Sequence, residues 1–490
     1  MKSTFFRSHF VFRIFPAFLI LLILFGSSFS LNAKEAAFVR ISKENPNYFE
    51  LSDGSPWIAI GVNLCILREY EPGTGKVRMV DDTEEGLRKI EFYFRKLSEN
   101  GGNYARIWLG SPFFEIERDH QGNYKKEILD RFAAVLKLAE KYGIRLKLCV
   151  EQFRQINPEV KVQTPLFLKK IYYTTPPSTV GEFVSSDLGK KYYLDRCRVF
   201  ADRFKDNPWI FGWEVWNEVN CLPSHYKWTK KVIGPLHEMF PNHLIMQSLG
   251  SFDRENHTEM YEKMVQMPEN EVAQVHRYLD PGAQLAICKG PMDKLAVDMV
   301  DRLRSYHSGK PILATEMGAV KKSHSGPSEL YPLDREGILF HDILFAPFFA
   351  GAAGSGHCWH WERYIEKNDL WYHIGRFSRA VKNVDPIRED LQPFRSPFEA
   401  QNASFMLYGL KGKTQTLIWI RSQADYWKTE LVEKAPAKTY TELEFSLPGC
   451  KADQVLVYDP WTDQEETLPV KNGSVRIPKF KRSIVVRWSK

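Results

Sequence analysis

Short apolar runs alternate with longer amphipathic stretches from about residue 57 to residue 383. Each run is short and bounded by polar or turn-forming residues, which is typical of parallel strands buried between helices. The pattern predicts eight strands, at residues 56–65, 104–110, 144–153, 210–219, 244–250, 272–279, 311–318 and 351–361.

The stretches between these runs have helical periodicity. Residues 83–100 and 126–143 are the clearest, and the second ends in Lys141 and Gly143, a common helix-stop signal. Eight strands alternating with helices indicate an α/β protein with a (β/α)8 TIM barrel. Two doubly wound domains would show the same alternation, but no glycine-rich phosphate loop follows any strand, so the barrel is preferred.

Beyond about residue 390 the pattern changes to short alternating strands separated by Gly, Asp, Asn and Lys turns. We therefore expect a barrel at residues 34–390 and a small all-β sandwich at residues 391–490. The sandwich is either a carbohydrate-binding module or a companion packed on the barrel. The companion is favoured, because no aromatic platform is recognisable. Residues 38–57 contain the turn signal Asp53-Gly54, which predicts small hairpins, and these could plug the N-terminal end of the barrel.

The first 33 residues have the three parts of a secretory signal peptide. A basic start precedes an apolar run from Ile14 to Phe25, which is too short to span a membrane comfortably, and Ala33 ends an acceptable cleavage site. We expect a signal peptide at residues 1–33, cleavage after Ala33, a secreted or periplasmic protein, and no stable membrane anchor.

Composition and charge argue against several other classes. The net charge is +7 over 490 residues and the lysine pairs are scattered, so no nucleic-acid partner is expected. The seven cysteines are odd in number and lack Cys-x-x-Cys spacing, which indicates neither a disulfide framework nor a zinc module. His357 and His360 would face opposite sides of a strand, so no metal is expected. We also expect no cofactor and a monomer.

Two glutamates end predicted strands where a barrel carries its catalytic residues. Glu218 ends the fourth strand in "WEVWNEV", and Glu316 ends the seventh in "ILATEMG". These strands face each other across the barrel mouth, so the two carboxylates can converge. Retaining glycoside hydrolysis needs such a pair about 5–5.5 Å apart, one as proton donor and one as nucleophile. Alternation places Glu214 deeper in the barrel, where we interpret it as a carboxylate bonded to a basic or polar neighbour.

These motifs resemble the retaining glycosidase clan that includes glycoside hydrolase family 5. The resemblance covers most of residues 57–383 and includes "YARIW", "VHRYL" and "GSGHCWHW" in the order that the family shows. It implies that Glu218 is the acid/base and Glu316 the nucleophile. It also implies substrate-binding or supporting roles for Arg106, Asn217, His276, Tyr278, Trp359 and Trp361.

The chain departs from many family members at two places. Val219, rather than proline, follows the Asn-Glu pair, and "CVEQFRQ" lacks the histidine that cellulase-like members carry at the end of strand three. The missing histidine, with "YARIWLG" and "GWEVWNE", is more similar to the β-mannanase branch. Substrate choice is expected to depend on the loops at residues 113–124 and 154–186.

These features together predict a secreted, retaining endo-β-glycosidase. Its partner is a polysaccharide or oligosaccharide substrate, β-1,4-linked and mannan-type rather than glucan. Two alternatives stay open. One is an exo-acting β-glycosidase or transglycosylase that uses the same carboxylates, and the other is a non-catalytic glycan-binding barrel.

Overall fold

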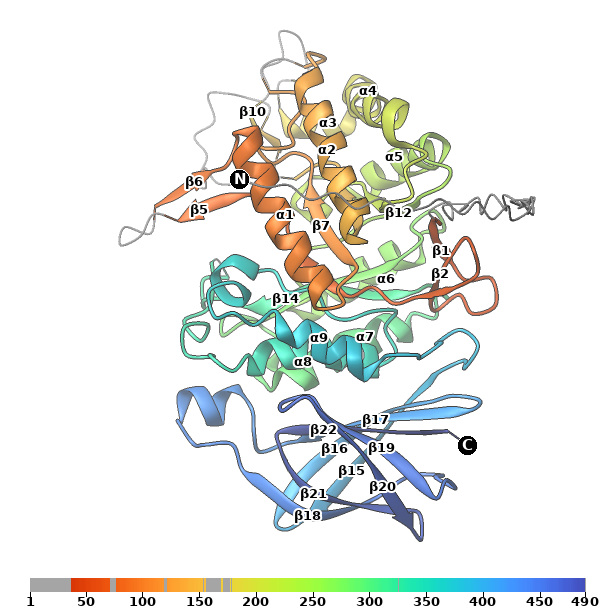
Figure 1. Ribbon diagram of the computed structural model, residues 1–490. Helices are drawn as coiled ribbons and strands as arrows, with labels where there is room; N and C mark the ends of the chain where they lie inside the picture. Colours follow the sequence, from red (N-terminus) through yellow and green to blue (C-terminus); the bar gives the residue numbers. More distant parts are fainter. Residues whose placement is uncertain are drawn as a thin grey trace, which may run out of the picture. The chain divides into compact units, whose positions relative to one another are not determined.

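The computed structural model describes residues 37–70, 76–118, 121–152, 177, 179–324 and 326–489, with the backbone alone of 154–155 and 169–170. The expected signal peptide lies outside the described residues, as does most of the expected loop at 154–186. Ala37–Lys490 forms one compact unit, whose elements are coloured in chain order in Figure 1. None of the helices in the described ranges combines the length and apolar character needed to cross a bilayer.

Seven of the eight expected strands are present, and they are parallel to their neighbours. One sheet has the order β12-β11-β8-β7-β4, and β13 pairs with β14. These strands are buried along their whole length, as expected for strands covered by helices. The predicted barrel is confirmed. Its strands are β4 (Gly61–Asn63), β7 (Tyr104–Trp108), β8 (Arg145–Cys149), β11 (Ile210–Glu214), β12 (Leu244–Met246), β13 (Ala273–Leu279) and β14 (Ile312–Ala319).

The prediction of an eighth strand at residues 351–361 was wrong, because this segment occupies the eighth position but does not form a regular strand. Two isolated parallel bridges, Ala59–Gly354 and Met317–Cys358, join this segment to its neighbours on either side. A Cβ on Gly354 would lie 2.4 Å from the Ala59 carbonyl oxygen, so the segment approaches its neighbour too closely for a side chain. The glycine-rich segment therefore closes the barrel without forming a continuous strand.

Helices follow the barrel strands and surround the sheet (Figure 1). Asp82 caps the first of them, because its side chain accepts a hydrogen bond from the Glu85 amide at 2.8 Å. The second ends where Gly143 adopts the left-handed conformation, with φ 67°. The helices are α1 (Thr83–Glu99), α2 (Lys126–Tyr142), α3 (Val180–Ser185), α4 (Asp187–Phe204), α5 (His225–Met239), α6 (Thr258–Gln266), α7 (Met292–Ser305), α8 (Ile338–Phe349) and α9 (Tyr372–Ala380).

The expected N-terminal hairpins form a three-stranded antiparallel sheet. Phe49 and Trp57 of this sheet pack against Phe211, at the start of β11, with ring centroids 5.3 and 5.2 Å apart. The sheet therefore lies against the N-terminal end of a barrel strand, as predicted. The short strands outside the barrel are β1 (Val39–Ile41), β2 (Phe49–Leu51), β3 (Pro56–Trp57), β5 (Arg68–Tyr70), β6 (Val77–Met79), β9 (Arg154–Gln155) and β10 (Lys169–Lys170).

The C-terminal region is a sandwich of eight antiparallel strands in the order β15-β16-β17-β22-β19-β20-β21-β18. Its core includes Phe405, whose ring lies 4.8 Å from that of Tyr440 and 5.4 Å from that of Phe445. None of the residues of β15 and β20 is buried, so these two strands lack the pattern of a half-buried strand. The strands are β15 (Gln392–Ala400), β16 (Ala403–Lys411), β17 (Gln415–Ser422), β18 (Thr439–Ser446), β19 (Gln454–Asp459), β20 (Gln464–Lys471), β21 (Ser474–Lys481) and β22 (Ser483–Ser489).

Helix α8 lies between the barrel and the sandwich. All of its residues are buried, and all except His341 and Asp342 are apolar. Phe345 and Phe349 of α8 contact Trp419 of β17, with ring centroids 5.7 and 6.2 Å apart. The sandwich thus covers a helix that would otherwise expose a large apolar surface, and it packs directly on the barrel.

An ion pair is buried in the same interface. The Arg421 guanidinium of β17 donates to both carboxylate oxygens of Asp342 on α8, at 3.0 and 3.1 Å, and each side chain is about 1% exposed.

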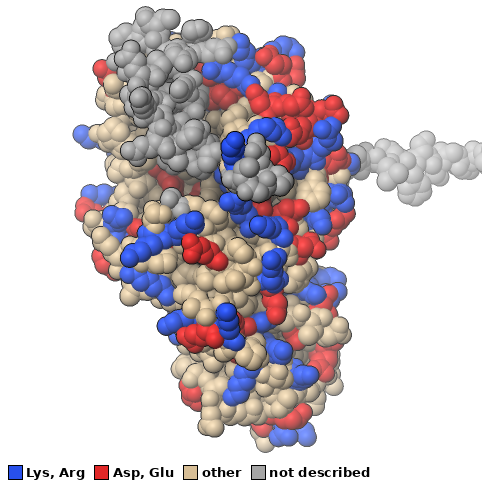
Figure 2. Space-filling model, turned by 90° about the vertical axis from the view of Figure 1, so that its left-hand side faces the viewer, with Lys and Arg blue, Asp and Glu red and all other residues tan. Residues whose placement is uncertain are grey.

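The charged side chains on the surface do not gather by sign on the face shown in Figure 2. Basic and acidic side chains are interspersed there.

We expect Arg421→Met to lower the free energy of unfolding by about 3–5 kcal/mol, because it leaves the Asp342 carboxylate buried without its cation. Denaturant unfolding of the full chain measures this loss. The control is Arg476→Met, which breaks the exposed pair with Glu444 in the same sandwich and should cost less than about 1 kcal/mol. Equal effects of the two substitutions would contradict the proposed importance of the buried pair.

Candidate active site

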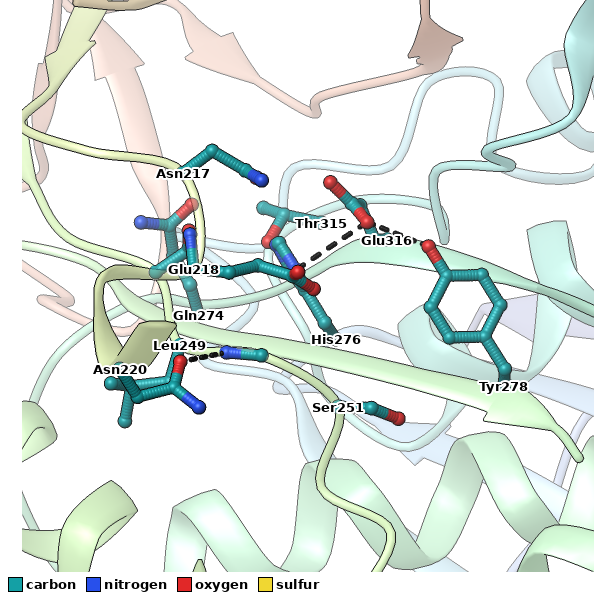
Figure 3. Close-up of polar contacts among 12 residues, drawn as sticks. Asn217, Glu218, Asn220, Leu249, Ser251, Gln274, His276, Tyr278, Thr315 and Glu316 are labelled. Atoms are coloured by element: carbon teal, nitrogen blue, oxygen red, sulfur yellow. Dashed lines mark hydrogen bonds and ion pairs between the residues drawn. The ribbon is translucent and has the colours of Figure 1, made fainter. Parts of the chain in front are cut away.

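The predicted site residues converge at the carboxyl ends of the barrel strands. Figure 3 shows Glu218, His276, Tyr278 and Glu316 directed toward one space. They come from segments far apart in the chain: Arg106 lies on β7, Asn217 and Glu218 follow β11, His276 and Tyr278 lie on β13, and Glu316 lies on β14.

Glu218 is positioned by a turn, and not by the end of a strand. β11 ends at Glu214, five residues before the predicted end of this strand at residue 219, and Glu218 has left-handed backbone angles of φ 47° and ψ 57°. Such angles cost a non-glycine residue about 1–3 kcal/mol and persist where the surroundings hold them. The Ser248 hydroxyl accepts from the Glu218 amide at 3.1 Å, and the Glu151 carbonyl accepts from the Asn217 amide at 2.8 Å.

The two predicted catalytic carboxylates lie close together. One oxygen of Glu218, one of Glu316 and a ring nitrogen of His276 are all within 4.8 Å of one another. His276 Nδ1 lies 3.0 Å from Glu218 Oε1 and 3.5 Å from Glu316 Oε2. The imidazole therefore bridges the two carboxyl groups.

Burial favours the protonated form of Glu218. It raises the pKa of this carboxyl, with Arg106 and His324 opposing the rise and Glu214 contributing to it. Burial also lowers the pKa of His276 to about 4, although the Glu316 carboxylate opposes this effect. A neutral His276 adds no positive charge that would draw the proton from Glu218.

Glu316 has partners that suit an ionised carboxylate. The Arg106 guanidinium donates to Oε1, and the Tyr278 hydroxyl donates to Oε2 at 2.6 Å. Burial, together with the two neighbouring glutamates, raises the pKa of Tyr278 well above its usual value, so the phenol keeps its proton as a donor. The two carboxylates thus have different surroundings, which allows one to act as an acid and the other as an anion.

Arg106 is fully buried and connects most of the site. Its guanidinium donates to Glu214 Oε2 at 2.8 Å and to Asn217 Oδ1 at 2.7 Å, besides Glu316. The amide oxygen of Asn63, on β4, accepts a longer bond at 3.4 Å. The interior position and basic partner that the sequence predicted for Glu214 are confirmed by these contacts.

The two predicted tryptophans differ in exposure. Trp359 is partly buried and lies beside Trp108, with ring centroids 5.0 Å apart. Trp361 is completely buried and meets Trp359 edge-on at 5.9 Å. Of the two roles expected for Trp361, the supporting one agrees with this burial, because its ring offers no exposed face.

Sequence reasoning missed several side chains near the site. Asn63 donates to the carbonyls of Thr315 and His357, each at 3.0 Å, and so ties β4 to the opposite side of the barrel closure. Lys147 contacts Glu214 in the barrel interior. The lysine had a recognisable signal, because it interrupts the apolar strand "IRLKLCV". Asn63 had none, since asparagine is common at strand ends.

Two groups of described residues have the types and spacing of metal ligands. One is Glu218, His276 and Glu316, and the other is Asp253, Asp280 and His324. In the second group, Asp280 accepts from His324 Nδ1 at 2.6 Å and from the Gly282 amide at 2.7 Å. In the first group, His276 contacts both carboxylates.

Comparison with known proteins identifies relatives of the chain. The family Cellulase (glycosyl hydrolase family 5) matches residues 85–332. "Mannan endo-1,4-beta-mannosidase 1" of Arabidopsis thaliana is 23% identical over 316 residues, which cover 56% of this chain and 72% of that protein. "Probable mannan endo-1,4-beta-mannosidase F" of Aspergillus oryzae is 23% identical over 174 residues, which cover 32% of this chain and 36% of that protein.

Solved structures share the fold over nearly the whole chain. A glycoside hydrolase family 5 protein from Bacteroides vulgatus matches with a TM-score of 0.55 and 11% identity, covering 92% of this chain and 93% of that one. A second structure, described as a glycoside hydrolase, matches with a TM-score of 0.56 and 12% identity, covering 92% and 96%. At such identities the likeness concerns the fold alone, and it spans more than the barrel.

Proposed function

The chain belongs to glycosyl hydrolase family 5 and is a glycoside hydrolase, and from this premise we propose that it hydrolyses a β-1,4-linked, mannan-type polysaccharide internally and with retention of anomeric configuration. Glu316 is the proposed nucleophile and Glu218 the proposed acid/base. The proposal includes secretion through the N-terminal signal of residues 1–33.

The spacing of the two carboxylates carries this proposal. An oxygen of Glu218 and one of Glu316 lie within 4.8 Å of each other. Retaining glycosidases keep the two carboxyl groups about 5–5.5 Å apart, whereas inverting enzymes need about 6.5–9.5 Å to admit a water molecule. The observed spacing favours double displacement over inversion.

In the first step, Glu316 attacks the anomeric carbon while the bond to the leaving oxygen breaks and Glu218 gives that oxygen its proton. The sugar is then held as an ester of Glu316, and the ionised Glu218 can accept a hydrogen bond from His276. In the second step, Glu218 takes a proton from water, whose oxygen attacks the anomeric carbon and releases Glu316. Two inversions give net retention. Asn217 is proposed to bond the sugar 2-hydroxyl in both transition states.

The names of the relatives support the choice of substrate. The Arabidopsis and Aspergillus proteins are both described as mannan endo-1,4-beta-mannosidases, at 23% identity to this chain. The chain spans 36% of the Aspergillus protein, so their shared activity enters here as support for a proposal. Trp359, at the barrel mouth, offers a partly exposed ring for stacking on a sugar.

We expect a ladder of oligosaccharides when the protein is incubated with soluble β-mannan, and weaker or no hydrolysis of β-glucan and xylan. Chromatography of the products measures this, and proton NMR of the first product should show the β-anomer. Monosaccharide as the sole product would replace the endo proposal with an exo one. An α-anomer as the first product would overturn the retaining mechanism.

Glu316→Gln should abolish turnover on mannan and on activated aryl glycosides, because an amide cannot form the glycosyl ester. Circular dichroism should show an unchanged fold. The control is Glu329→Gln, an exposed glutamate in the segment after β14, which should keep the parent activity. Substantial activity of Glu316→Gln would exclude this residue as nucleophile.

Glu218→Ala should lower kcat/KM on mannan by about 100- to 10,000-fold, but should affect substrates with good leaving groups much less. Because hydrolysis of mannan needs protonated Glu218, activity should fall as pH rises through the raised pKa of this residue. That alkaline limb should be absent when the variant acts on activated substrates.

Added azide should restore turnover of Glu218→Ala on activated substrates and yield a β-glycosyl azide. Glu259→Ala, at a 77% exposed side chain on α6, is the matched control. No rescue by azide in a folded variant would count against the acid/base role of Glu218.

A further inference from the structure

A lysine lies in the interior of the barrel, on the far side of Glu214 and Arg106 from the proposed nucleophile. Lys147 of β8 has no exposed side-chain surface, which is rare for lysine unless the charge is paired. Its Nζ lies 3.1 Å from Glu214 Oε2, and it also donates to the side-chain oxygen of Gln274 on β13.

The lysine and Arg106 share one carboxylate. Glu214 Oε2 accepts from Arg106 at 2.8 Å and contacts Lys147 at 3.1 Å, while the other side of the Arg106 guanidinium donates to Glu316. Four charges therefore form a buried chain in the order Lys147, Glu214, Arg106 and Glu316. Two are positive and two negative, so the chain is neutral as a whole.

Lys147 and Glu214 hold their charges in this setting. Burial alone would raise the pKa of Glu214, but Arg106 and Lys147 lower it to about 2. Burial lowers the pKa of Lys147 to about 8, against the opposing effect of Glu214. Between these two values the pair is ionised.

The other titratable groups around the chain are shifted toward their neutral forms. Burial raises the pKa of Cys65, Cys149, Tyr104 and Tyr278 and lowers that of His276 and His357. Burial also raises the pKa of Glu218, which faces Asp253 and His324 at the mouth. Among these groups, the charges beside Glu316 are therefore those of Arg106, Glu214 and Lys147.

We propose that Lys147 and Glu214 are positioning residues that set the ionisation of Glu316 through Arg106. Lys147 neutralises part of Glu214, so that Arg106 remains available to the Glu316 carboxylate. Without Lys147, one arginine would serve two buried carboxylates and the chain would carry a net negative charge. Without the charge of Glu214, the chain would carry a net positive charge. This inference rests on the proposed role of Glu316 as nucleophile.

The two single substitutions should shift the pH profile in opposite directions. Lys147→Met removes a positive charge, which disfavours ionised Glu316, so the acidic limb of kcat/KM should move upward by about one pH unit. Glu214→Gln removes a negative charge, so that limb should move downward. The double variant Lys147→Met/Glu214→Gln leaves Arg106 with Glu316 alone and should return the limb to the parent position.

The probe is 2,4-dinitrophenyl β-mannobioside, whose leaving group needs no proton, so the acidic limb reports the nucleophile rather than Glu218. Lys126→Met, at an 83% exposed lysine on α2, is the control and should keep the parent profile. Lower kcat with unshifted limbs in all three variants would overturn the proposal in favour of a purely structural role. If Lys147→Met does not fold, Glu214→Gln and the double variant decide, since equal profiles for these two would also overturn it.

A failure of the proposed function would give a different experimental result. Glu316→Gln assayed on the same glycoside tests the nucleophile directly, and its activity would refute the catalytic assignment. Inactive Glu316→Gln with unshifted profiles in the Lys147 and Glu214 variants would refute only the positioning role.

Discussion

The site depends on the hydrogen bonds and ion pairs that the Arg106 guanidinium makes. This guanidinium is completely buried and contacts side chains from three other strands or strand ends, namely Asn63, Glu214 and Glu316, together with Asn217 in the turn after β11. A buried cation requires paired carboxylates, and buried carboxylates require a cation. The barrel interior therefore holds its charges only as a set, and the set fixes how the strands carrying it are placed around the axis.

The strained turn at Glu218 is the second constraint. β11 ends early, and the chain turns through a left-handed residue before it enters the next short helix, Val219–Cys221. Hydrogen bonds from the segment after β12 hold this turn. Asn217 also donates to the Glu151 carbonyl, in the segment after β8. Because the turn is anchored to the ends of both neighbouring strands, the position of Glu218 depends on the register of β11 with β8 and β12.

The apolar runs predicted the barrel and the alternating strands predicted the sandwich, and the shared edge of the strand ends brought Glu218 and Glu316 together. The other residues that meet at the mouth were implied by the resemblance to glycoside hydrolase family 5, and no pattern along the chain predicted them. The sequence could not predict how Glu218 reaches its place, since alternation assumes a strand that continues to residue 219. The glycine-rich segment at 351–361 has an apolar run like a strand, but backbone contact at Gly354 replaces regular pairing. The partner of a buried charge, such as Glu214 for Lys147, depends on how the barrel strands are aligned with one another. No pattern within a single strand predicts this alignment.

Helix α8 has a consequence for the synthesis of the chain. Its covering strands include β17, which pairs with β22 at the end of the chain. At 5–20 residues per second, about 7–30 s separate the completion of α8 from the completion of β22. During that interval α8, which is apolar except for His341 and Asp342, is only partly covered. Until β22 is made, the strand that covers Phe345 and Phe349 lacks this partner, so the barrel and the sandwich are expected to complete their folding together.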